Sequence, residues 1–78
     1  MSDTLTLEEK QIIVNQHIRN LDFSIYGLEM DLVEANAVSP TDSEYISTVE
    51  DRLAALNLKK TALLAEKDIL VALAASSS

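Results

Sequence analysis

The chain contains no cysteine and no tryptophan, and its 78 residues include a single glycine and a single proline. The absence of cysteine excludes disulfides, thiolate metal sites and cysteine nucleophiles. Because a secreted protein of this size normally needs disulfides, we expect a cytoplasmic, intracellular location, with association with a virion as one form of it. Scarce glycine and proline favour long uninterrupted helices over a β-rich fold.

Basic side chains are also scarce. Six Lys and Arg residues stand against thirteen Asp and Glu residues, which gives a formal net charge of −7. An acidic surface opposes binding to nucleic acids and to anionic membranes, because both partners select basic proteins. The longest apolar run, residues 69–75, is far shorter than the roughly 20 residues of a membrane span. The expected partners are therefore proteins.

Apolar residues recur at alternating steps of four and three along two long segments. This heptad spacing lines one stripe of a helix, and such a stripe must be buried against another helix. The first series is Val14, Ile18, Leu21, Ile25, Leu28, Leu32 and Ala35, and the second is Ile46, Val49, Leu53, Leu56, Leu63 and Leu70, with Lys60 and Lys67 in two further slots.

Pro40 lies between the two series, and a short connection forces consecutive helices to run antiparallel. We therefore expect one all-α domain over residues 1–78, a coiled-coil-like αα-hairpin of two long antiparallel helices. The expected ranges are about 7–37 for the first helix, about 38–41 for the turn, about 42–75 for the second helix and 76–78 for a disordered serine tail. A hairpin this small has little core, so we expect oligomerisation to complete it as a helical bundle.

Capping signals mark both helix starts. Thr6 and Glu9 fit a capping box, in which each side chain hydrogen-bonds the backbone N–H of the other. The second helix has two candidate starts. Ser39 can cap it with Pro40 in the first helical position, or Thr41 can form a second capping box with Glu44. The sequence leaves these two alternatives open.

Each helix carries a second apolar stripe, roughly 150° around from the first at 100° per residue. A hairpin has one internal seam, so these second stripes stay exposed, and contiguous exposed apolar surface usually marks an interaction site. Small alanines on the second helix suit close packing against the larger side chains on the first. The predicted interface residues are Phe23, Tyr26, Met30, Val33, Leu58, Ala62, Ala65, Ile69 and Ala72.

The charges suggest pairing between the helices. No acidic residue lies three or four positions before a basic one, the arrangement that stabilises a solvent-exposed helix. With the turn near Pro40, Lys60 should lie near Asp22, and Lys67 near Glu8 or Glu9. The alternative is that both lysine stems pass the edge of the seam and bring their ammonium groups to solvent.

Residues that carry chemistry are few. His17 is the only histidine, and it flanks the seam without a second ligand at metal-binding spacing. There is no nucleophile–base pair and no glycine-rich phosphate loop, so we expect no enzyme activity, no catalytic residue, no metal and no cofactor. Gly27 lies inside the first helix, where it is either simply tolerated or allows a neighbouring backbone to approach.

Two functions fit these observations. The first is a non-enzymatic structural or assembly protein that self-associates, as a dimer or higher oligomer, or docks as a small component of a larger complex such as a virion. The second is an acidic regulatory binder that masks a basic protein surface as a nucleic-acid mimic does. The carboxylates available for that role are Asp22, Glu29, Asp31, Glu34, Glu50 and Asp51.

Overall fold

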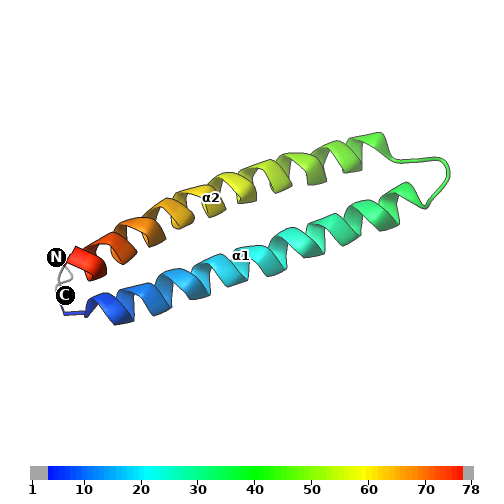
Figure 1. The fold of residues 1–78 in the computed structure, drawn as a ribbon. Helices are drawn as coiled ribbons and strands as arrows, with labels where there is room; N and C mark the ends of the chain where they lie inside the picture. The colour runs from blue at the N-terminus through cyan, green and yellow to red at the C-terminus, as the bar shows by residue number, and fades with distance from the viewer. Residues whose placement is uncertain (1–3, 77–78) are drawn as a thin grey trace.

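The computed structural model describes residues 4–76, and it is an antiparallel pair of helices. Helix α1 spans Leu7–Asn36 and helix α2 spans Ser43–Ser76. The two helices run side by side, with the turn at one end and the start of α1 and the end of α2 at the other (Figure 1). The molecule measures 59 × 22 × 15 Å. The expected all-α hairpin is therefore confirmed.

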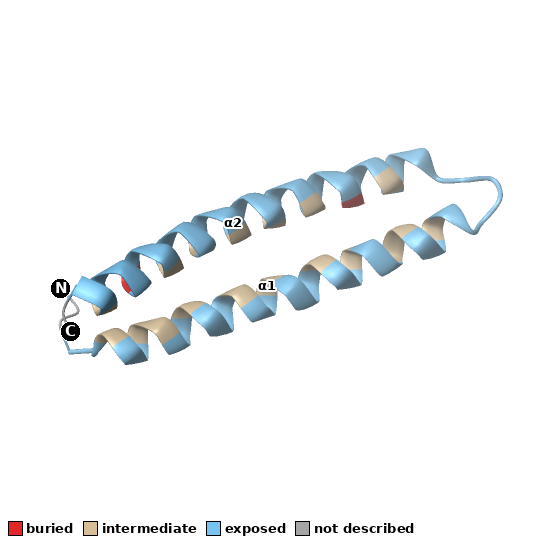
Figure 2. Cartoon of the chain, viewed as in Figure 1, coloured by how far each residue is buried: buried red, intermediate tan, exposed pale blue. Residues whose placement is uncertain are grey.

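The two heptad series form the seam between the helices. Every member of both series is buried or half-buried, and the shielded residues lie on the facing sides of α1 and α2 (Figure 2). Only Val49 and Leu70, with exposed fractions of 2% and 5%, are buried among the described residues, and neither is sealed completely from solvent. Lys60 and Lys67 occupy half-buried seam positions, as their spacing predicts. Because each helix has a neighbour on one side only, the seam is shielded without forming a closed core.

Local hydrogen bonds fix the ends of α1. The backbone N–H of Glu9 donates to the Thr6 hydroxyl at 3.1 Å, and the N–H of Thr6 donates to Glu9 Oε1 at 2.9 Å. These two bonds are the predicted capping box, and they satisfy N–H groups that have no partner within the helix. At the other end the Asn36 side-chain amide donates to the Leu32 carbonyl at 2.8 Å.

The start of α2 differs from both predicted alternatives. The N–H of Tyr45 donates to Asp42 Oδ1 at 3.1 Å, so Asp42 is the N-cap rather than Ser39 or Thr41. A carboxylate is a stronger cap than a threonine hydroxyl, and its negative charge also suits the positive end of the helix dipole. Pro40 consequently lies in the turn, with a cis peptide bond to Ser39, and not in the first turn of α2.

The ends of the helices differ slightly from the expected ranges. Helix α1 ends at Asn36, with Ala37 as its C-cap, and α2 begins at Ser43, so the turn is longer than residues 38–41. Ser76, expected in a disordered tail, is instead the last residue of α2, and its hydroxyl donates to the Leu73 carbonyl at 3.1 Å. Ser77 and Ser78 lie outside the described residues.

The assignment of the α2 cap gives a testable prediction. Replacing Asp42 by Ala removes the hydrogen bond to the Tyr45 N–H and should lower the free energy of unfolding by about 1 kcal/mol. The matched control, Ser39→Ala, should change it by less than about 0.5 kcal/mol. Urea denaturation followed by circular dichroism, at one fixed protein concentration, measures both. A larger loss for Ser39→Ala than for Asp42→Ala would contradict the assignment.

Candidate helix-docking surfaces

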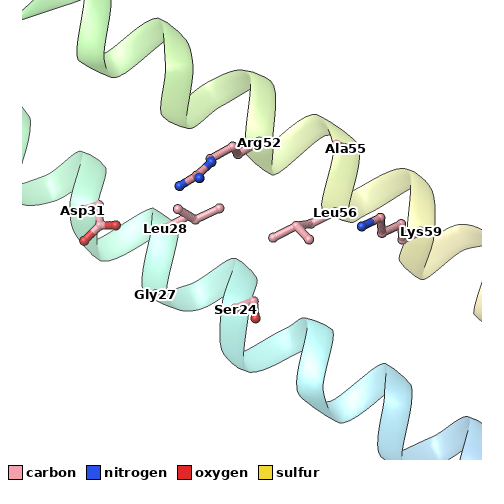
Figure 3. Close-up of a pocket in the computed structure, with 8 residues that line it drawn as sticks. All are labelled: Ser24, Gly27, Leu28, Asp31, Arg52, Ala55, Leu56 and Lys59. Carbon is pink, nitrogen blue, oxygen red and sulfur yellow. The ribbon is translucent and has the colours of Figure 1, made fainter.

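One broad face of the hairpin is hollowed into a groove between α1 and α2. Two adjoining hollows of about 610 and 490 Å³ share Ser24 from α1 and Lys59 from α2 as lining residues. Figure 3 shows the larger one, with Leu28 and Leu56 extending from the two helices into the space between them. We call this side of the molecule the groove face.

Four small residues on the rim help to keep the groove open, between longer side chains such as Arg52 and Lys59. Ser24 and Gly27 on α1, and Ala55 and Ala62 on α2, lie just outside the leucines of the seam. A Cβ atom built on Gly27 would meet nothing within 4 Å. Within the hairpin, therefore, Gly27 does not serve the close approach of another backbone. Small rim residues and an apolar floor leave space for the side chains of another helix, since side-chain size sets how closely helices pack.

Two further hollows extend the groove face toward both ends of the molecule. One, of about 300 Å³, lies at the turn and shares Asp31 with the central hollow. The other, of about 210 Å³, lies at the open end between Lys10 and Glu66. The charged groups along the face are thus unevenly placed: Asp31, Glu34 and Asp42 border the hollow nearest the turn, whereas the basic residues Arg52 and Lys59 line the central hollow.

An ion pair occupies the opposite broad face. Lys60 Nζ lies 2.6 Å from Asp22 Oδ1, and the two side chains are 33% and 50% exposed. This pair confirms one predicted contact between the helices. The predicted pairing of Lys67 with Glu8 or Glu9 is wrong, since no ion pair joins these residues within 4–76. Glu9 instead folds back on its own helix as part of the capping box.

The second stripe of α1 lies on the outer edge of the hairpin, toward the face with the ion pair. Phe23, Tyr26 and Val33 are 66%, 61% and 60% exposed, and Met30 is 37% exposed. The Arg19 guanidinium sits 5.2 Å from the centre of the Phe23 ring, which shields one side of that ring. Arg19, Asp22, Phe23 and Tyr26 together line a shallow hollow of about 280 Å³.

The second stripe of α2 is divided between two surfaces. Ala55 and Ala62 line the groove, whereas Leu58, which is 72% exposed, lies on the outer edge of α2. Ala65 and Ala72 follow Leu58 at heptad spacing on that edge, and Ile69, 53% exposed, lies on the groove side. The α1 stripe and the α2 edge thus lie at opposite edges of the hairpin, so one flat partner surface cannot cover both.

The groove was not predicted from the sequence, although four of its lining residues share a pattern in the sequence. Ser24, Gly27, Ala55 and Ala62 are small, and all four lie beside the seam on the same side of the heptad pattern. Such a set of small residues indicates an open side only once the antiparallel register of the two helices is known. His17, expected to flank the seam, is exposed and lines the groove.

The described residues hold no group of three or more His, Cys, Asp or Glu side chains that could bind a metal ion. No helix in residues 4–76 has the length and apolar content that a membrane span requires. The six carboxylates considered for a nucleic-acid mimic are spread around both helices, and Asp22 is paired with Lys60. Their placement therefore does not form a single acidic face.

Comparison of the chain with protein-family models, with curated proteins and with solved structures gives no match. The surfaces of the hairpin itself are therefore the basis for its function.

Proposed function

We propose that this protein is a non-enzymatic structural protein that works by helix–helix association. Its unpaired apolar surfaces would bury against other helices, either in copies of the same chain or in a larger protein complex. The observation that supports this most strongly is the exposure of large apolar side chains on both helices, with Phe23 at 66% and Leu58 at 72%. Contiguous apolar surface of this kind is uncommon on proteins that act alone.

The balance of burial in the hairpin supports the same conclusion. Two buried side chains in residues 4–76 are a small core for two helices of 30 and 34 residues. Ordering a chain of this length costs more conformational entropy than one partly shielded seam offsets. Association would bury further apolar area at roughly 25 cal/mol per Å² and stabilise the helices at the same time.

Substitution on the outer stripe of α1 tests the proposal. Phe23→Glu should raise the dissociation constant of an association that buries this stripe by about tenfold or more, because a buried phenyl ring contributes roughly 1.5–3 kcal/mol. Gln16→Glu is the matched control: it lies one heptad earlier on the same exposed edge and adds the same charge. Light scattering after size exclusion gives the masses, and circular dichroism shows that both variants stay helical. Equal masses for Phe23→Glu, Gln16→Glu and the unmodified chain would refute a role for this stripe.

The acidic regulatory binder is the second candidate function, favoured by one observation. The seven acidic residues of residues 23–58 are accompanied by one basic residue, Arg52, so the half of the hairpin next to the turn is strongly negative. Such a protein would hold a basic partner by charge, and its affinity would fall steeply with salt.

Salt dependence separates the two functions. If the chain acts by burying apolar surface, its association should persist between roughly 0.05 and 1 M salt, since screening does not weaken apolar burial. Sedimentation equilibrium at both salt concentrations measures this. A chain that is monomeric at both salt concentrations, and that binds a basic protein only at low salt, would favour the acidic binder instead.

A further inference from the structure

We propose that the groove face binds the groove face of a second copy of this chain, with the two hairpins reversed so that each turn lies over the open end of the other. This inference rests on the proposed function and specifies both the occupant of the groove and its orientation. The outer edges that carry Phe23 and Leu58 stay outside this interface and remain available to a further helix. In this arrangement α1 lies on α1 of the second copy and α2 lies on α2, which gives a four-helix bundle with antiparallel neighbours.

The size of the face is sufficient for a stable pair. A 59 × 22 Å face has a projected area of about 1,300 Å², whereas a standard stable interface buries roughly 800 Å² on each partner. The groove also offers what a facing helix requires, an apolar leucine floor and a rim of small residues. The opposite broad face carries the Lys60–Asp22 ion pair instead.

The distribution of charge along the hairpin selects the reversed orientation. Residues 23–58, the half nearest the turn, contain seven acidic side chains and one basic side chain, a net charge of −6. Residues 4–22 and 59–76 contain five acidic and five basic side chains, a net charge of zero. Two hairpins with their turns at the same end would place the two halves of charge −6 in contact, within the roughly 8 Å over which charges interact at physiological salt. Reversal places each acidic half against a neutral half.

Oppositely charged residues that line the groove also come together when one hairpin is reversed on the other. Lys10 and Glu34 both line the groove face, and they lie at nearly equal distances, roughly 17–19 Å, on either side of the middle of α1. Reversal therefore places Lys10 of each hairpin beside Glu34 of the other. Arg52 and Glu66 lie at roughly 10–11 Å on either side of the middle of α2 and match in the same way.

Near the centre of the proposed interface, a large side chain of one copy faces a small residue of the other. His17 and Gly27 lie roughly 7–8 Å on either side of the middle of α1, so the imidazole of each copy meets the space left by glycine in the other. Lys59 lies at the middle of α2, so the reversal brings it close to Lys59 of the second copy. Its four-carbon stem can remain in the groove while its ammonium group reaches solvent.

Two measurements on the full chain test this inference. Because the sequence has no cysteine, Ser39→Cys carries a single nitroxide label at the turn. Pulsed dipolar spectroscopy should then give a distance between the two labels close to the 59 Å length of the hairpin. A distance of a few helix widths, roughly 10–25 Å, would place both turns at one end and overturn the proposed orientation.

The second measurement identifies the face. Ala62→Glu should raise the dissociation constant of the dimer by about tenfold or more, because its larger side chain fills space in the groove that the second copy would occupy. Asn57→Glu, equally far from the middle of α2 but on the opposite broad face, should change the constant by less than about twofold. If Ala62→Glu has no effect while Phe23→Glu dissociates the chains, the groove inference fails and the proposed function stands. A monomer at every concentration would overturn the dimer outright.

Discussion

A pair of helices has one seam, and every other feature of this protein depends on that constraint. Each helix can bury only the stripe that faces its neighbour, and here those stripes are Val14 to Ala35 on α1 and Ile46 to Leu70 on α2. The apolar residues outside the seam therefore stay in contact with water, as Phe23 and Leu58 do. Burying them requires helices from another molecule, which links the stability of this fold directly to its association.

Polar groups at the seam make the two broad faces different. The Lys60 ammonium leaves its seam position toward Asp22 and occupies one face, whereas several residues beside the seam on the other face, Ser24, Gly27 and Ala55 among them, are small and leave a groove. An ion pair this exposed contributes little to stability but favours one register of the helices. The uneven charge along the long axis adds a second asymmetry, so the hairpin has a distinct face and a distinct direction.

The sequence was informative wherever a structural feature is periodic or local. Heptad spacing located the seam, the spacing of Thr6 and Glu9 located the first cap, and the turn position placed Lys60 beside Asp22. It failed where neighbours in sequence compete for one role, as when Asp42 capped α2 instead of Thr41. It also missed the groove, because the openness beside Gly27 depends on how both helices are aligned and not on either helix alone.

The exposed apolar surfaces of the hairpin should be buried where copies of the chain associate with one another. The mass of the chain in solution across a dilution series, with circular dichroism recorded on the same samples, tests this. We expect a mass of at least twice the 8.6 kDa of one chain, with helicity that is retained in the assembly and falls only when dilution dissociates it. A fully helical monomer at every concentration would contradict it.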